Sequence, residues 1–150
     1  MYNTYMFNAN SKEPEMNKYT FSNELYSDLH KDVYGCRPGE TGFRYWSSLD
    51  AEGKQQEWDN LIATLSEMEA EKREFQAKQV EKFEARIALT IRCGAKDRVT
   101  AIRWILDCED QLDLKFFGAD KVAYEHGFPY NHPLVDEINS VIATMFKEAA

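Results

Sequence analysis

The sequence contains few of the residues that cross-link or interrupt a fold. Its 150 residues include three cysteines, four prolines and seven glycines. The cysteines, Cys36, Cys93 and Cys108, are far apart and form no CxxC pair, which argues against a disulfide framework or a structural zinc site. We expect free thiols, as in a reducing cytoplasm, with Cys93 and Cys108 buried as small apolar side chains.

Long apolar runs are also missing. No stretch approaches the roughly 20 apolar residues that cross a bilayer. Residues 1–16 are polar and aromatic rather than basic and then apolar, which is not the pattern of a secretory signal. The chain has 26 acidic and 18 basic residues, and its net charge of −8 disfavours general binding to nucleic acid or to anionic membranes.

The familiar catalytic motifs are absent as well. The sequence has no GxxxxGK[ST], GxGxxG, HExxH or GxSxG pattern, so phosphate cradles, zinc proteases and hydrolase elbows have no support. His126 and His132 bracket a loop that offers two metal ligands but specifies no third. We therefore expect no metal, no cofactor and no enzymatic activity, and keep an enzyme with an unrecognised site as an alternative.

What the sequence does contain is the apolar spacing of helices. Leu25, Leu29 and Val33 recur every four residues, which predicts a helix over about 22–34. Three further helices are expected in the second half of the chain, at about 98–111, 118–126 and 133–148. No segment alternates for long enough to form a sheet. The predicted fold class is all-α, with helical hairpins around one long, partly charged helix.

The long helix is expected over about 51–93, either as one helix or as two with a kink near 76–80. Apolar residues occupy the a and d positions of a heptad in its first half, namely Trp58, Leu61, Leu65 and Met68. Residues 69–82 are almost wholly charged and predict a coiled-coil-like arm, with self-association into a homo-oligomer as the simplest pairing. We expect residues 1–17 to be an N-terminal extension and 18–150 to be a single helical domain.

A loop rich in glycine and aromatic residues is predicted over 36–46. Gly35 supplies the left-handed residue that ends the first helix, and Pro38 prevents its continuation. We expect Arg37 to reach the carbonyl groups at the helix end and Tyr34 to pack beneath it. A partner-binding role is the alternative for the exposed groups of this region, which are Tyr34, Arg37, Tyr45 and Trp46.

Basic residues collect over 80–106, where six of them stand against three acidic residues. A helix-turn-helix there would present three basic side chains to nucleic acid, namely Lys96, Arg98 and Arg103. Its inward positions would be Thr100 and Arg103, whereas the apolar residues are Val99 and Ile102. We therefore favour a packed hairpin with Val99 and Ile102 inward, and keep a nucleic-acid-binding regulator as an alternative function.

Acidic residues collect after residue 106, where nine stand against three basic residues. A DNA-mimic inhibitor would use such a face to imitate the phosphates of a nucleic-acid backbone, with Asp107, Glu109, Asp110, Asp113, Asp136 and Glu137 as the carboxylates. This is a second alternative function, beside the ordinary solvation of a small acidic protein.

Residues 32–38 read Asp-Val-Tyr-Gly-Cys-Arg-Pro and end the first predicted helix. This segment resembles the Asp-Val-Tyr-Gly-x-Arg-Pro signature of a family of small, poorly characterised proteins from tailed bacteriophages. The similarity continues through the charged helix and Gly-Ala-Lys-Asp-Arg at 94–98, and it covers about 16–145. The sequence departs from the pattern at Cys36, where an aromatic residue is common, and at Gly39, where a second arginine often follows the proline.

The resemblance implies a bacteriophage accessory protein that acts in the cytoplasm of the infected host, and it transfers no catalytic residue. A small, acidic, helical protein without catalytic motifs suits stoichiometric inhibition by a surface. We therefore predict a non-enzymatic protein that binds and inhibits or modulates a host protein, in defence or in nucleic-acid metabolism. The expected surfaces are the loop 36–46 and the charged arm 69–82. A structural component of the virion is a further alternative.

Overall fold

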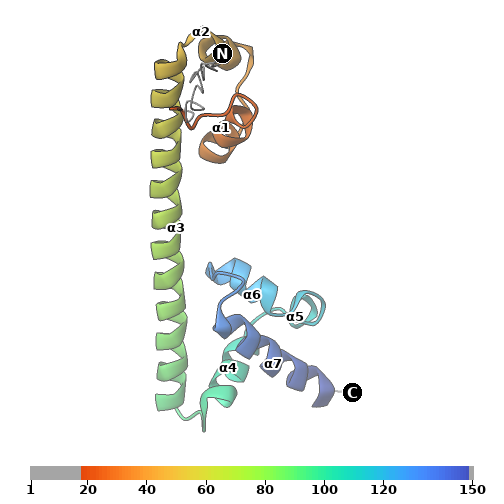
Figure 1. Ribbon diagram of the computed structural model, residues 1–150. Helices are drawn as coiled ribbons and strands as arrows, with labels where there is room; N and C mark the ends of the chain where they lie inside the picture. Colours follow the sequence, from red (N-terminus) through yellow and green to blue (C-terminus); the bar gives the residue numbers. More distant parts are fainter. Residues whose placement is uncertain (1–17, 149–150) are drawn as a thin grey trace, which may run out of the picture. The chain divides into compact units, whose positions relative to one another are not determined.

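A computed structural model describes residues 18–148, which are helical without any strand (Figure 1). The all-α fold class predicted from the sequence is therefore confirmed. Among these helices, none combines the length and the apolar character that a membrane span requires. The expected N-terminal extension, residues 1–17, lies outside the described residues.

The described residues form two compact units that divide between Glu67 and Met68. Each unit has its own hydrophobic core. The sequence, in contrast, predicts a single domain over 18–150. The long helix α3 (Ala51–Arg92) passes through the division and contributes side chains to both cores. We describe unit 1, up to residue 67, and unit 2, from residue 68, separately.

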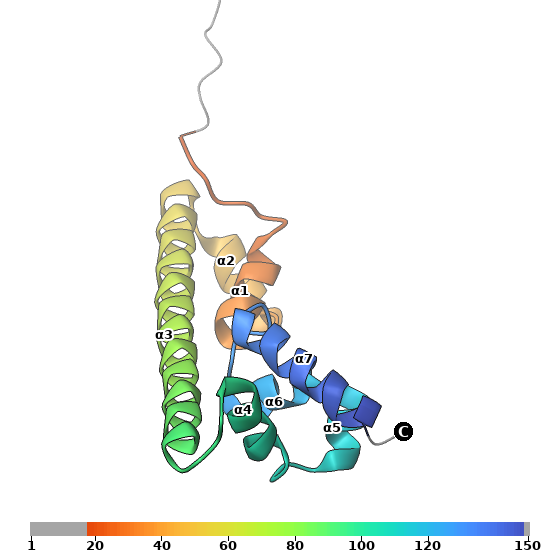
Figure 2. The same cartoon turned by 90° about the horizontal axis from the view of Figure 1, so that it is seen from below.

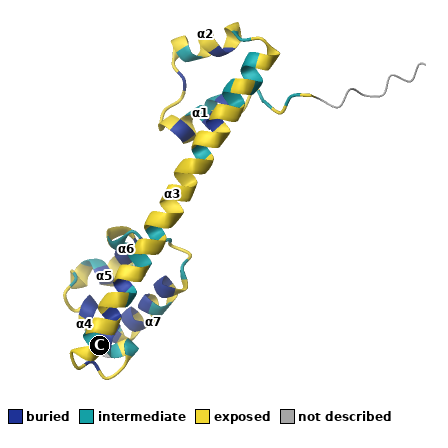
Figure 3. Cartoon of the chain, turned by 90° about the vertical axis from the view of Figure 1, so that its left-hand side faces the viewer, coloured by how far each residue is buried: buried dark blue, intermediate teal, exposed yellow. Residues whose placement is uncertain are grey.

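Helix α3 is continuous over the range predicted for it, without a break at 76–80. Asp50 caps its first turn, since the carboxylate Oδ1 accepts a hydrogen bond from the Gly53 N–H at 2.8 Å. After its last residue, Gly94 adopts a φ of 121°, which favours glycine and stops the helix. Figure 3 shows exposed residues along the middle of α3, and every residue from 66 to 75 is exposed. Residues 69–75 of the predicted charged arm are therefore exposed, whereas Val80 near its end packs against the core of unit 2. Pairing of the arm with a second copy stays a prediction.

Unit 1 is built by α1 (Tyr26–Tyr34), α2 (Glu40–Ser48) and the first part of α3. Its core joins apolar side chains of α1 to aromatic and aliphatic side chains of α2 and α3, namely Tyr26, Leu29, Val33, Trp46 and Leu61. Helix α1 begins four residues later than predicted. The Ser22 hydroxyl instead caps a turn, accepting a hydrogen bond from the Leu25 N–H at 3.2 Å, and Leu25 is exposed.

Helix α2 occupies most of the stretch predicted as a loop, so that prediction is wrong beyond residue 39. Glycine and aromatic residues give this stretch a weak helix propensity, which tertiary packing overrides. The Trp46 ring stacks on the Tyr26 ring, with centroids 4.0 Å apart. An ion pair of 2.6 Å between Glu40 and Arg44, one helical turn apart, adds local support.

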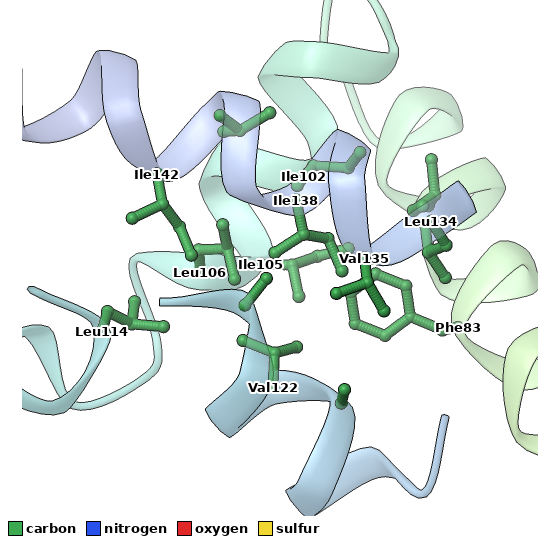
Figure 4. Packing of buried hydrophobic residues seen from close by; sticks show 14 of the residues in the cluster. Phe83, Ile102, Ile105, Leu106, Leu114, Val122, Leu134, Val135, Ile138 and Ile142 are labelled. Atoms are coloured by element: carbon green, nitrogen blue, oxygen red, sulfur yellow. The ribbon is translucent and has the colours of Figure 1, made fainter. Parts of the chain in front are cut away.

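Unit 2 is built by the last part of α3 and by α4 (Arg98–Leu106), α5 (Gln111–Phe117), α6 (Ala119–His126) and α7 (Pro133–Glu148). Helix α7 contacts α4, α5 and α6, as Figures 1 and 2 show from two directions. Figure 4 shows the core between these helices, where apolar side chains point toward one another, among them Phe83, Ile102, Ile105, Leu106, Leu114, Val122, Leu134, Val135, Ile138 and Ile142.

The helix predicted over 98–111 ends at Leu106, and α5 is a separate helix. Asp110 produces this new start, because its Oδ1 accepts hydrogen bonds from the N–H groups of Leu112 and Asp113 at 2.9 and 3.0 Å. A carboxylate that satisfies the free N–H groups of a first turn favours a helix beginning at the next residue.

Two expectations about burial are wrong. Val99, expected inward, is 54% exposed, because the buried stripe of α4 begins at Ala101 and continues with Ile102. Cys93 and Cys108 are exposed rather than buried, since each immediately follows a helix or its C-terminal cap instead of facing the core.

Candidate protein-binding surface

The structure places the predicted partner-binding residues of unit 1 in different environments. Tyr34 and Tyr45 are 60% and 50% exposed, so their rings are accessible. Trp46 is only 4% exposed and its indole N–H donates to Asn23 Oδ1 at 3.0 Å. Trp46 is therefore a core residue that offers no surface to a partner. The sequence misses this because an aromatic residue in an expected loop has no visible packing partner.

The end of α1 is held differently from the prediction. Gly35 adopts the expected left-handed conformation, with φ of 75°, but Arg37 does not reach the helix-end carbonyl groups. The Arg37 guanidinium instead turns back to the start of α1, donating to Ser27 Oγ at 2.9 Å and pairing with Asp28 at 2.7 Å. The Tyr34 ring does not pack beneath the helix end, since it is exposed beside the His30 ring.

The basic hairpin over 80–106 uses one of its cations internally. The Arg98 guanidinium forms two hydrogen bonds with Glu84 on α3 and two with Glu137 on α7, all between 2.6 and 2.8 Å. These bonds raise the pKa of Arg98 and lower the pKa of Glu84. Lys96 is exposed, whereas Arg103 is half-buried and has an interaction of its own. The proposed nucleic-acid residues therefore do not form one open cationic face.

Replacement of Arg98 by methionine is expected to lower the free energy of unfolding by about 1 kcal/mol at neutral pH. The loss is modest because Arg98 and Glu84 are 41% and 40% exposed and solvent screens the pair. The hydrogen bonds from Arg98 lower the pKa of Glu84, so the stabilisation is full above the ordinary carboxyl pKa. It is lost as the pH falls through the lowered value. Urea unfolding at neutral pH and at a series of falling acidic pH values measures the loss at neutral pH and its decline with acid.

Lys96→Met is the matched control, because it removes an exposed cation from the same hairpin. We expect its unfolding free energy to stay within about 0.5 kcal/mol of the wild-type value at each pH. An Arg98→Met loss of equal size at neutral and acidic pH would contradict the ion-pair explanation and assign the effect to packing of the arginine stem.

The acidic residues proposed as a DNA mimic are largely committed to contacts within the chain. Asp110 caps α5, Asp113 pairs with Lys121, Glu109 lies 3.3 Å from His126 Nε2, and Glu137 binds Arg98, which together engage four of the six carboxylates. No group of three or more potential metal ligands exists among the described residues. Four of these carboxylates therefore stabilise unit 2 through contacts within the chain and do not form one continuous acidic face.

A surface that residue spacing does not reveal lies on α5, on α6 and in the loop that follows α6. We call it the aromatic surface, and it consists of Phe116, Phe117, Tyr124 and Tyr130, which are 72%, 65%, 77% and 59% exposed. Together with charged side chains of the same helices these rings line a cavity of about 740 Å³. Four large rings this exposed around one hollow form an apolar patch of the kind that marks binding sites.

The local structure explains why these rings point outward. Helix α5 buries Leu114 and helix α6 buries Val122 and Ala123, so the rings on their other faces remain in solvent. Gly118 joins the two helices with φ of 60° and ψ of −147°, a conformation that only glycine adopts readily. The side chain of Asn139 on α7 fixes the junction, because its Oδ1 accepts a hydrogen bond from the Ala119 N–H at 2.9 Å.

The acidic side chains around the cavity are more exposed than the basic one. Lys121 pairs with Asp113 at 3.4 Å and with Glu125 at 2.5 Å, and the hydrogen bond with Glu125 raises the pKa of Lys121. The Lys121 side chain is only 13% exposed, whereas those of Asp113 and Glu125 are 46% and 42% exposed. Asp120 also lines the cavity and is exposed. Lys121 also lines the cavity, so a molecule at this surface meets rings, three carboxylates and one ammonium group that two of those carboxylates hold.

The aromatic surface continues beside α3. A second cavity, of about 470 Å³, is lined by Tyr124 and Tyr130 together with Phe75 and Gly127. Gly127 ends α6 with φ of 76°, and a Cβ atom added there would lie 3.1 Å from Phe75 Cε1. The close approach places the exposed Phe75 ring against the α6 end, which extends the apolar patch.

One sequence signal points to this surface in retrospect. Phe116 and Phe117 are adjacent in a seven-residue helix, and adjacent residues cannot both face a core that lies on one side.

Comparison with known protein families, with curated proteins and with solved structures finds no match to this chain. The geometry of the aromatic surface is therefore the evidence for a function.

Proposed function

We propose that this chain is a non-enzymatic binding protein that uses the aromatic surface to occupy another protein. The observation that carries the proposal is the exposure of Phe116, Phe117, Tyr124 and Tyr130 around one cavity. Aromatic side chains are enriched at protein interfaces and supply much of their binding energy. Phe116, Phe117 and Tyr124 stand on helices that pack on a buried core, so these three rings lose little conformational freedom when a partner covers them.

The partner belongs to the proposal as well. If the chain is the bacteriophage accessory protein that residues 32–38 resemble, the partner is a host protein and the site of action is the host cytoplasm. Binding would then inhibit or modulate that protein stoichiometrically, in defence or in nucleic-acid metabolism. A surface with exposed rings suits this mode of action.

The proposal is tested by capture from a host lysate with two double variants of the tagged protein. Phe116→Ser with Tyr124→Ser removes rings from the aromatic surface, and Tyr34→Ser with Tyr45→Ser is the matched control on unit 1. We expect a host protein that the wild type and the control retain and that the first variant recovers at least about tenfold less. Half of each lysate is treated with nuclease, and the retained protein is expected in both halves.

Both double variants are expected to fold, because the replaced rings are at least half exposed and surface changes cost about 0.5 kcal/mol each. Far-UV circular dichroism checks this. Loss of capture in the Tyr34/Tyr45 variant alone would move the interface to unit 1. Recovery only without nuclease would contradict protein binding and favour nucleic acid at the basic hairpin 80–106.

A further inference from the structure

The cavity at the aromatic surface combines two kinds of group that together recognise one kind of cation. Ring faces attract cations through their quadrupole, and a carboxylate accepts charge-assisted hydrogen bonds. Both line the same hollow, with rings from Phe116, Phe117 and Tyr124. Its charged lining is three carboxylates and one cation, namely Asp113, Asp120, Glu125 and Lys121. Asp120 has no ion pair within the described residues, whereas Glu125 pairs with Lys121.

The negative charge of the surrounding segment limits which molecules could bind in the cavity. Residues 107–150 hold nine acidic and three basic residues, a balance of −6. A second copy of this chain would bring the same negative charge to the same face, and nucleic acid or an anionic lipid would also be repelled. A basic partner would be attracted within about 8 Å, the Debye length at physiological salt, because opposite charge steers association as well as stabilising the contact.

We propose that the aromatic surface binds a basic segment of the partner through arginine side chains, an inference that rests on the proposed function. A guanidinium group is planar, so it stacks on an aromatic ring while its N–H groups donate to a carboxylate at the edge. Asp120 receives this group, and Glu125 does so beside the Lys121 ammonium that it already holds. Apolar residues next to the arginines fill the rest of the cavity, whose whole volume is about 740 Å³.

Fluorescence anisotropy with short labelled peptides tests the proposal on the full chain. The probe peptide alternates arginine with leucine, and its matched control carries citrulline, which has nearly the same shape without the charge, in place of each arginine. We expect the arginine peptide to bind at least about tenfold more tightly, with an affinity that falls as salt is added. Equal affinities for the two peptides would overturn the proposal.

Asp120→Asn and Asp136→Asn form a matched pair of variants for the same measurement. Each removes one exposed carboxylate from the first turn of a helix in unit 2, but only Asp120 lines the cavity. We expect Asp120→Asn to weaken the arginine peptide about threefold to tenfold and Asp136→Asn to leave it unchanged. An equal effect of both variants would mean that only the overall charge attracts the peptide, which also overturns the proposal.

Two further outcomes separate this inference from the proposed function. If the Phe116/Tyr124 variant loses the host protein but the wild type does not bind the arginine peptide, the binding function stands and arginine recognition fails. If the wild type binds vesicles that contain phosphatidylserine more tightly than the arginine peptide, the surface is a membrane contact and arginine recognition fails. We expect no vesicle binding, because the carboxylates repel an anionic membrane.

Discussion

Replacement of Trp46 by alanine is expected to destabilise unit 1 by about 3–5 kcal/mol. The indole is 4% exposed and lies flat on the Tyr26 ring, with centroids 4.0 Å apart and an angle of 11° between the planes. The Phe21 ring meets the same indole edge-on at 5.9 Å, and Asn23 accepts its N–H. Alanine would leave a cavity among these groups, and Asn23 Oδ1 would keep only the hydrogen bond that it accepts from Lys54 Nζ at 3.1 Å.

Urea unfolding followed by far-UV circular dichroism measures this loss, and near-UV circular dichroism reports the aromatic packing. Tyr45→Ala is the matched control, since the neighbouring ring is half exposed and its loss should cost only about 0.5 kcal/mol. Trp46→Phe keeps a stacking ring but not the hydrogen bond to Asn23, so we expect an intermediate loss. If Trp46→Ala unfolds like the wild type and loses a partner instead, Trp46 is an interface residue and the core assignment is wrong.

Replacement of Phe83 by alanine is expected to destabilise unit 2 by about 3–5 kcal/mol. Phe83 is 3% exposed and joins α3 to the core formed by the helices that follow it. Its ring packs edge-on against Phe128 at 5.1 Å and against His126 at 5.2 Å between centroids. Aromatic pairs of this geometry contribute beyond the apolar area that they bury, so the smaller side chain loses both terms.

Leu89→Ala is the control for Phe83→Ala, because it shortens an apolar side chain of the same helix that is 51% exposed. We expect its unfolding free energy in urea to differ from the wild-type value by about 0.5 kcal/mol or less. Amide hydrogen exchange should show loss of protection in α4, α6 and α7 for Phe83→Ala only. Similar losses for the two variants would contradict the placement of the Phe83 ring in the core.

The elements that could be predicted from the sequence are those that local chemistry determines. Asp50 and Asp97 cap α3 and α4, since a carboxylate next to a helix start needs only the following N–H groups. Gly35 and Gly94 end their helices with positive φ for an equally local reason. The continuous range of α3 follows from helix-forming residues over its whole length, with neither proline nor an internal cap.

The elements that were not predictable depend on packing between distant residues. Helix α2 is stabilised because Trp46 packs on Tyr26, a residue twenty positions earlier. Residue spacing along the sequence does not reveal this contact. The aromatic surface was missed for the opposite reason, because a phenylalanine is expected in the core unless its neighbours occupy the inward positions. Leu114 occupies that position in α5, so Phe116 and Phe117 remain outside. Tyr34 and Tyr45 are exposed, and their role in partner binding stays a prediction.

Site-specific photo-crosslinking tests whether the aromatic surface binds another protein. A benzoyl-phenylalanine at position 117 replaces one ring of the aromatic surface with a reactive ring, and the same residue at position 34 probes unit 1. After irradiation in host lysate, we predict one adduct between the chain and a different protein from position 117, which an excess of the arginine peptide suppresses. An adduct from position 34 alone, or one from position 117 that contains only a second copy of the chain, would contradict the account.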